Sequence, residues 1–170
     1  MLNSNIEDIL NAQINKEFYS AYLYIAMSAH FDRMGLKGFA NWTKVQAKEE
    51  MDHGMIIFDY IIARDGKVNL HPIEAPTNTF NNPLQIFEMI LSHEKIVTES
   101  IAKVANLSED ECDRATRLFI DWYISEQVEE EAQVLDVIKK IKMFGTDCSI
   151  LYHLDSELMS REYKSHSYPS

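Results

Sequence analysis

The chain has 170 residues, of which 46% are hydrophobic and 25% are charged, with only 5 Gly and 4 Pro. This composition allows one domain with a sizeable core and long helices, because few residues interrupt them. The formal net charge of −11 argues against nucleic acid and anionic membranes as partners and favours cations. We see no secretory pattern and no apolar run of about 18 residues, so we expect a cytoplasmic protein, with free thiols at Cys112 and Cys148.

The first two helices are predicted as an antiparallel hairpin. Ser4 and Glu7 have the spacing of a capping box, and apolar residues recur at helical spacing after them. Gly35 is the glycine expected just after a helix that ends near Met34. The link over residues 35–38 is short, so the second helix, from about residue 39 to residue 64, must fold back along the first.

Residues 67–82 lack helical periodicity and contain Pro72 and Pro76. A structureless connection of this length is unusual inside a compact domain and needs a reason. Sixteen extended residues can cover at most about 55 Å, whereas a helix of 26 residues is about 39 Å long. The segment can therefore run the whole length of a bundle, which leaves the second and third helices parallel.

A third helix is predicted to start at Asn82-Pro83, with Asn at the cap and Pro in the first turn, and to end near Asn106. Ser108 and Glu111 form a second capping-box pattern, which predicts the start of a long fourth helix. Gly145 would end this helix, and its expected apolar face consists of Ala115, Leu118, Phe119, Trp122, Val134, Val137 and Ile141.

The remaining chain predicts one short helix and a tail. An amphipathic segment from about residue 146 to residue 161 must pack outside a bundle that four helices already close, with other subunits as one option. The polar residues 165–170 are expected to be disordered. The predicted fold class is all-α: one domain over residues 1–170, with a four-helix bundle over about residues 5–144, a long crossover between helices two and three, and a short fifth C-terminal helix.

The second helix carries the most informative pair of residues. Glu50 and His53 are three residues apart, so their side chains leave from one face, and that face is otherwise apolar. A carboxylate and an imidazole in a core are costly unless they are paired or bind a metal. This Glu-x-x-His arrangement is expected of a di-metal carboxylate site inside a helix bundle.

The other three long helices also place acid in the middle of their apolar faces. Glu17 does so on the first helix, Glu94 on the third, and Glu126, Gln127 and Glu130 on the fourth. One such glutamate usually reaches out to water, but four helices burying acid at one depth would raise the carboxyl pKa values by mutual repulsion. A bound metal ion removes that cost. Many oxygen ligands with a single His favour iron or manganese over structural zinc.

The fourth helix lacks the second Glu-x-x-His of a symmetric site. Gln127-Val128-Glu129-Glu130 stands in its place, so one of two metal ions has fewer ligands. Looser binding of that ion suits a protein that passes metal on better than one that keeps a fixed oxidase cofactor.

Taken together, these motifs resemble the bacterial-type non-haem ferritins over essentially the whole chain. The resemblance implies a dinuclear iron centre, with a first iron held by Glu17, Glu50 and His53 and a second held by bridging Glu50, Glu94 and Glu130, with Gln127 close by. It also implies a third iron site at Glu49, Glu126 and Glu129, with Glu130 shared, and a role for Tyr24 as an electron donor during oxygen reduction. The implied protein is a ferroxidase: a homo-oligomeric cage of twenty-four subunits that oxidises iron(II) with dioxygen or hydrogen peroxide and stores iron(III) as a mineral.

Related families fit these residues less well. Met51 stands where bacterioferritins have a haem-ligating methionine, but the second Glu-x-x-His is missing, so haem is not expected and Met51 is interpreted as a packing residue. Miniature DNA-protecting ferritins lack the fifth helix, and rubrerythrin-like peroxidases need the second His. Two alternatives from other classes are a metal-buffering protein without oxidase turnover and a metal-free bundle with solvated acids. The other histidines are expected at the surface or in loops: His30, His71, His93, His153 and His166.

Overall fold

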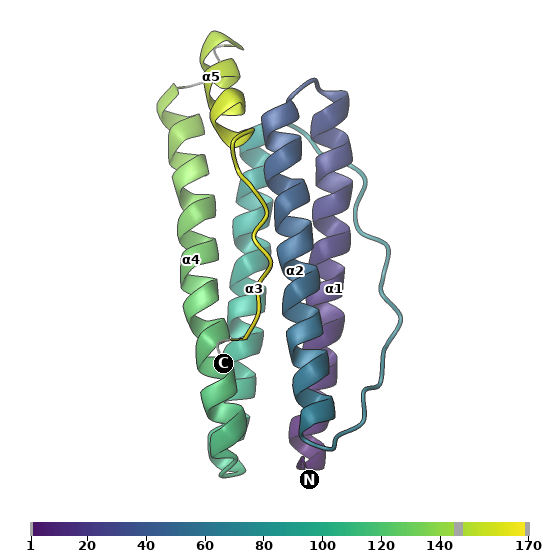
Figure 1. Cartoon of the computed structure of the whole chain (residues 1–170). Coiled ribbons are helices and arrows are strands. Elements are labelled where there is room, and N and C mark those ends of the chain that lie inside the picture. Colours follow the sequence, from purple (N-terminus) through teal and green to yellow (C-terminus); the bar gives the residue numbers. More distant parts are fainter. Residues whose placement is uncertain (1, 145–147, 169–170) are drawn as a thin grey trace.

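The structure is a computed structural model that describes residues 2–144 and 148–168. Within these residues all the regular elements are helices, and four long ones lie side by side as a bundle (Figure 1). The helices are α1 (Ser4–Arg33), α2 (Lys37–Ala63), α3 (Pro83–Asp110), α4 (Arg114–Phe144) and α5 (Cys148–Leu158). The predicted all-α fold, a four-helix bundle with a short fifth helix, is confirmed. No helix in the described part of the chain is both long enough and apolar enough to cross a membrane.

The α1–α2 hairpin differs from the prediction only where it begins. Asn3 is the N-cap, because its side-chain oxygen accepts a hydrogen bond from the Asn5 N–H at 2.8 Å, and Ser4 is already helical. The capping box at Ser4 was therefore wrong by one residue. At the other end Gly35 has a φ of 80°, and the Leu36 N–H bonds to the Phe31 carbonyl at 3.0 Å, which ends α1 as predicted.

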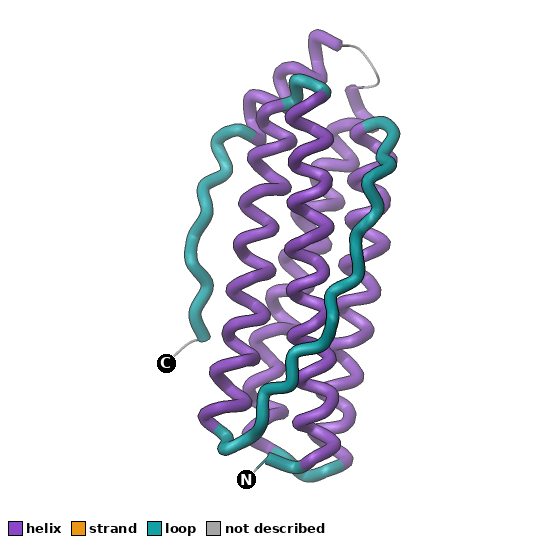
Figure 2. The backbone as a smooth tube through the Cα atoms, turned by 90° about the vertical axis from the view of Figure 1, so that its right-hand side faces the viewer, coloured by secondary structure: helices purple, strands orange, loops and turns teal. Residues whose placement is uncertain are grey.

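The predicted crossover is present. The segment between α2 and α3 runs along the whole bundle, so these two helices are parallel (Figures 1 and 2). The side chain of Asn11 fixes its start: its Nδ2 donates to the Lys67 carbonyl at 3.0 Å, and its Oδ1 accepts from the Asn69 N–H at 2.7 Å. Asn15 donates to the carbonyls of His71 and Pro72 at 3.2 and 3.1 Å. Polar groups of α1 thus bind backbone groups that have no partner in a helix or sheet.

The α3–α4 turn lies later in the chain than predicted. Ser108 does not cap α4; it is buried inside α3 and donates to the Val104 carbonyl at 2.7 Å. Because Val104, Ala105 and Ser108 continue the buried face, the helix does not stop at Asn106. Asp113 caps α4 instead, accepting from the Thr116 N–H at 3.1 Å. Gly145, expected to end α4, lies outside the described residues.

The core consists of two apolar clusters, one toward each end of the bundle, with a polar layer between them. Each long helix contributes to both clusters and carries a polar residue between its two contributions. On α1, for example, Glu17 lies between Ile14 of one cluster and Leu23 of the other. On α3, Glu94 lies between Ile90 and Val97 in the same way. The layer is therefore held at one depth by apolar packing on both sides.

The inward face of α4 differs from the predicted one near the start of the helix, whereas Val134, Val137 and Ile141 are buried as predicted. Phe119, Ile120 and Tyr123 are buried, whereas Leu118 is 67% exposed in the single chain. Ala115 is also exposed. Ala115 and Leu118 were therefore wrongly assigned to the inward face, which Thr116, Phe119 and Tyr123 occupy in this part of the helix.

The short helix α5 packs on the end of its own bundle. Leu154 and Leu158 are buried in the cluster that also contains Phe39. The Asp155 carboxylate accepts from the backbone N–H groups of Gly38 and Phe39 at 2.8 and 3.0 Å, and so caps α2, whose own N-cap residue supplies no side chain. A Cβ atom on Gly38 would lie 1.6 Å from the Asp155 carbonyl oxygen, so glycine permits this close approach.

The C-terminal tail does not behave as predicted. Residues 159–168 leave α5 and run back along the bundle beside α2 and α4 (Figure 1). The Tyr163 hydroxyl and the His166 N–H both donate to Asp52 Oδ2, at 2.7 and 2.8 Å. The rings of Tyr168 and Phe119 lie 5.1 Å apart between centroids. The expected disorder from residue 165 was therefore wrong for residues 165–168, and the last two residues lie outside the described part.

Replacing Asp155 with Ala is expected to lower the free energy of unfolding by about 1 kcal/mol, because two backbone donors at the start of α2 lose their acceptor. Urea denaturation followed by circular dichroism measures this change. The control is Glu157→Ala on the same helix, which removes only an exposed ion pair with Lys140 and is expected to cost less than about 0.5 kcal/mol. Equal losses in the two variants would contradict the capping role.

Candidate metal centre

Four acids and one histidine converge in the polar layer, one group or more from each long helix. Ligand atoms of Glu17, Glu50 and His53 all lie within 4.8 Å of one another, and the same holds for Glu50, Glu94 and Glu130. All five side chains are buried. The structure thus brings together the residues predicted for a dinuclear centre, with Glu50 common to both groups.

Two glutamines orient these carboxylates. Gln13 donates to Glu17 Oε1 at 2.7 Å, and Gln46 donates to Glu50 Oε1 at 3.1 Å and to Glu130 Oε1 at 2.8 Å. Neither glutamine was predicted as a residue of the site. A signal was present, since each precedes its glutamate by four residues and therefore shares its helix face.

Tyr24 and Gln127 hold the carboxylate of Glu94. The Tyr24 hydroxyl donates to Glu94 Oε1, and the Gln127 amide donates to Glu94 Oε2 at 3.2 Å. Both side chains are buried. Tyr24 therefore lies in direct contact with the acid layer, as its predicted role requires, and Gln127 contacts the layer through its N–H₂ group.

His53 faces the acids with one ring nitrogen and the tail with the other. Its Nδ1 lies 3.6 Å from Glu50 Oε2 and 3.9 Å from Glu130 Oε1. Its Nε2 lies 3.0 Å from Nδ1 of His166. His166 is in the non-helical tail, as expected of a surface or loop residue, but its contact with His53 was not predicted, because nothing local in the sequence indicates where a tail docks. The Tyr123 hydroxyl also donates to the His53 carbonyl, at 2.7 Å.

Burial makes this layer unfavourable as a set of free carboxylates. Loss of hydration raises the pKa of Glu50 and of Glu130 well above the ordinary value, and repulsion from neighbouring carboxylates adds to it. Burial also raises the pKa of Glu17 and of Glu94. Glu130 Oε2 is buried without any hydrogen-bond partner. A carboxylate-rich layer with an unpaired oxygen fits a bound cation, which would supply both the missing partner and the missing charge.

The residues predicted for a third iron site are arranged differently. Within the described chain, Glu49, Glu126 and Glu129 do not come together as one cluster of ligand atoms. Glu49 is buried and pairs with Arg161 of the tail at 2.5 Å, whereas Glu129 is exposed. Glu126 instead lies near His166, with 3.9 Å between its Oε2 and the His166 Nδ1.

Met51 does not pack into the core. Its side chain is 45% exposed in the single chain, so its interpretation as a packing residue stays a prediction. Met51 lies between the buried residues Glu50 and His53 in the sequence, but its side chain leaves α2 on the exposed side of the helix.

Comparison with known proteins agrees with this geometry. A protein-family model described as "Ferritin-like domain" matches residues 7–144. The chain belongs to the ferritin family. This ferritin is 40% identical over 163 residues to a bacterial non-heme ferritin of Staphylococcus saprophyticus, covering 96% of this chain and 98% of the relative. It is 37% identical over 161 residues to a bacterial non-heme ferritin of Bacteroides fragilis, covering 95% of this chain and 100% of the relative.

Solved structures give the same result. An engineered closed form of the Archaeoglobus fulgidus ferritin superposes with a TM-score of 0.95 at 43% identity, covering 96% of this ferritin and 100% of that chain. The open-pore ferritin of the same archaeon gives a TM-score of 0.93 at 43% identity, covering 95% and 98%. The resemblance to bacterial-type non-haem ferritins is thereby confirmed, and membership of the family supports iron binding and iron storage.

The raised pKa values predict how the metal-free ferritin responds to pH. Above the ordinary carboxyl pKa of 4.5, the folded chain holds protons at the acid layer that the unfolded chain has lost. This contribution to stability is complete below the unfolded pKa and is lost as pH rises through the folded pKa values. The melting temperature without metal should therefore fall as pH rises above the ordinary carboxyl pKa of 4.5.

Variants of neighbouring glutamates on α4 isolate this effect. Glu130→Gln, which removes a buried acid, should flatten the dependence of melting temperature on pH. Glu129→Gln, which changes an exposed side chain one residue away, should keep the slope of the unmodified ferritin. If both variants kept that slope, the acid layer would not be its source.

Proposed function

We propose that this ferritin oxidises iron(II) at a dinuclear centre in the acid layer and deposits iron(III) as a mineral inside a cage. The observation that carries the proposal is the convergence of Glu17, Glu50, His53, Glu94 and Glu130 in two buried groups that share Glu50. A shared carboxylate can bridge two ions at close range. Such a centre is characteristic of carboxylate proteins that bring two iron ions to one oxygen molecule.

In this proposal iron(II) is the substrate. Glu17, Glu50 and His53 would hold the first ion, and Glu50, Glu94 and Glu130 the second. The second group has no histidine, so its ion would be bound more loosely and pass on more readily after oxidation. Each iron(II) gives one electron to dioxygen, and the reduced oxygen takes up two protons to form hydrogen peroxide. Carboxyl groups with raised pKa values hold protons in the metal-free layer and would release them when cations bind.

Tyr24 would act as a further electron donor. Its hydroxyl donates to Glu94 Oε1, so a proton acceptor is already in contact with the phenol. Burial raises the pKa of Tyr24 well above the ordinary value, with repulsion from Glu94 as the next cause, so the phenol keeps its proton until an electron leaves. Proton and electron could then depart together, the proton to Glu94.

Removing the shared carboxylate tests the centre. In the variant Glu50→Ala with His53→Ala, the initial rate of iron(II) oxidation in air should fall by at least about tenfold, because both groups lose ligands. The matched control is His153→Ala, which changes an exposed histidine on α5. An unchanged initial rate in the double variant would refute this assignment. Oxygen consumed per iron(II) added separates oxidation from metal buffering, which would consume none.

We also propose the third iron position at Glu49, Glu126 and Glu129, with Glu130 shared, and we infer that Arg161 competes for it. The Arg161 guanidinium donates to Glu49 Oε2 at 2.5 Å and to Gln46 Oε1 at 2.8 Å. It also lies over the Trp42 ring, 4.4 Å from the centroid. A cation that binds Glu49 must therefore displace a positive charge that the tail already supplies.

Arg161→Gln should consequently strengthen binding of the weakest iron(II) class by about threefold to tenfold, since the competing charge is gone. Anaerobic iron(II) titration calorimetry measures this. Arg117→Gln is the control, because Arg117 pairs only with exposed Glu109 and Asp121. If Arg161→Gln bound iron(II) no more tightly than the control, the third position would not depend on Glu49.

The cage is proposed from the family and from the exposed apolar side chains of the single chain. Ile25, Ile96, Leu118 and Val128, on three different helices, are all more than half exposed. Several such surfaces suit a chain that contacts several copies of itself in the cytoplasm. Twenty-four copies of a 19.7 kDa chain have a mass of about 470 kDa. Native mass measurement should give this value, and a dimer mass of about 39 kDa would exclude the cage.

A further inference from the structure

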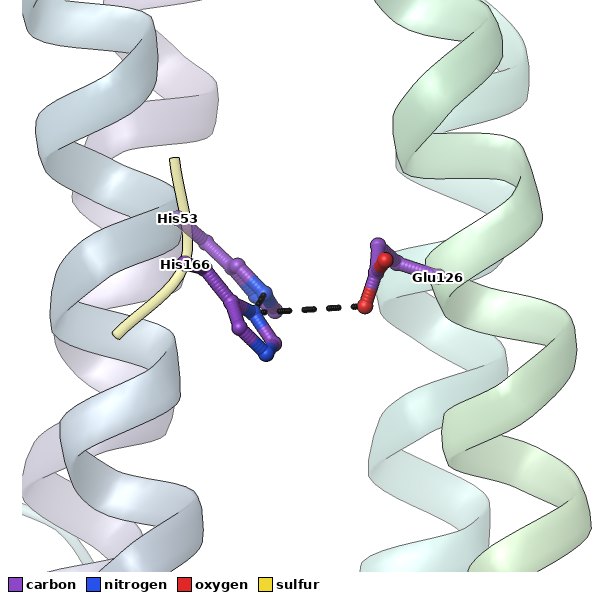
Figure 3. Close-up of side chains that lie close together, drawn as sticks. All are labelled: His53, Glu126 and His166. Atoms are coloured by element: carbon purple, nitrogen blue, oxygen red, sulfur yellow. Dashed lines mark hydrogen bonds and ion pairs between the residues drawn. The ribbon is translucent and has the colours of Figure 1, made fainter. Parts of the chain in front are cut away.

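A second cluster of ligand side chains lies outside the acid layer, on the side that the tail covers. His53 of α2, Glu126 of α4 and His166 of the tail point toward one another (Figure 3). Their ligand atoms all lie within 4.8 Å of one another. We propose that these three residues form an outer site for a divalent cation of the zinc or iron(II) class, which shares His53 with the first inner group and Glu126 with the proposed third iron position.

The distances suit one ion. His53 Nε2 and His166 Nδ1 are 3.0 Å apart, and His166 Nδ1 and Glu126 Oε2 are 3.9 Å apart. Ligand atoms that each lie about 2.0–2.2 Å from an ion are separated by no more than about 4.4 Å. Both separations fall inside this limit. Ligand atoms of His53 and Glu126 lie within 4.8 Å of one another, and rotation of the Glu126 side chain could bring them inside the limit.

The donor set differs from that of the inner groups. Two imidazoles and one carboxylate, with positions left for water, are used by catalytic zinc sites and by non-haem iron(II) sites. The inner groups are rich in oxygen and contain a single histidine. The side chains of His166 and Glu126 are 25% and 21% exposed, so a cation can reach the outer site from solvent. A pocket of about 380 Å³ that Asp52, Asp59 and His166 help to line opens beside it.

The tail holds His166 in place without a metal. Its backbone N–H and the Tyr163 hydroxyl share the acceptor Asp52 Oδ2. The ring stacks on that of His53 with centroids 5.2 Å apart, and Trp122 packs edge-on against both imidazoles. A ligand that is already positioned loses little freedom when a cation binds.

The position of His53 links the outer site to the inner one. Its Nδ1 faces Glu50 and Glu130, and its Nε2 faces His166. A neutral imidazole has one nitrogen with a free lone pair, so His53 can ligate on one side at a time. A cation in the outer site therefore withdraws His53 from the inner first position, and the two sites compete for it.

Zinc binding to the intact metal-free ferritin tests this, and zinc is not oxidised, so the result does not depend on the proposed iron oxidation. His166→Phe keeps a ring against His53 but removes the ligand, and titration calorimetry should show one class of zinc sites weakened by at least about tenfold. His153→Phe, at an exposed histidine of α5, should leave that class unchanged. Anomalous diffraction from zinc-loaded crystals should place a peak bonded to His166 and Glu126.

The competing explanation is that His166 only orients His53 through a hydrogen bond. His166→Asn separates the two roles, since its amide oxygen can replace Nδ1 as an acceptor but is a poor zinc ligand. The outer site predicts that Asn behaves like Phe in the zinc titration. If Asn restored zinc binding, or if the anomalous peaks lay only among the inner acids, the outer site would be refuted and His166 would be a positioning residue for His53.

Discussion

The structure depends on one constraint, the burial of four carboxylates at a single depth between two apolar clusters. Water is excluded from both sides of the layer, so each carboxylate loses hydration and repels the others, and the pKa values of Glu50 and Glu130 rise accordingly. Hydrogen bonds from Gln13, Gln46 and Tyr24 reduce this cost but leave Glu130 Oε2 unpaired. Apolar packing enforces an arrangement that bound protons or a bound cation would complete. The stability of the fold and the affinity for metal are therefore linked through the same atoms.

Helix lengths set the common depth. Glu17 lies sixteen residues before the end of α1, and His53 lies sixteen residues after the start of α2, so both are about 24 Å from the turn that joins them. In the second hairpin, Glu94 lies sixteen residues before the end of α3, and Glu130 lies sixteen residues after the start of α4. The crossover brings that second turn to the opposite end of the bundle (Figure 1). Each hairpin thus places its two ligand residues at the same depth. Because the crossover spans the full length of the bundle, both pairs lie near its middle, at the same level.

Features that depend on residues close together in the sequence could be predicted, and features that depend on contacts between distant residues could not. The helices and the acids of the layer are visible in helical spacing, because each depends on neighbours within one or two turns. The crossover is visible as a long segment that lacks this spacing. The capping pattern at Ser108 was misread because the apolar face continues through that residue. Gln13 and Gln46 carried a local signal that was overlooked. The path of the tail carried none, since it depends on single polar contacts such as Tyr163 with Asp52, more than a hundred residues apart.

The tail places Arg161 and His166 next to potential cation ligands on the solvent side of the acid layer. The Arg161 guanidinium pairs with the Glu49 carboxylate. Burial lowers the pKa of Arg161, and the charge of Glu49 acts in the opposite direction. Further along, His166 presents a nitrogen to His53 and to Glu126. The first contact competes with a cation and the second can bind one, and both lie on the same extended segment. A cation that approaches from the tail side must therefore displace Arg161 to bind Glu49, but can bind directly at Glu126. Since His53 belongs to both the outer cluster and the inner centre, the imidazole of that residue is the shortest connection between the two.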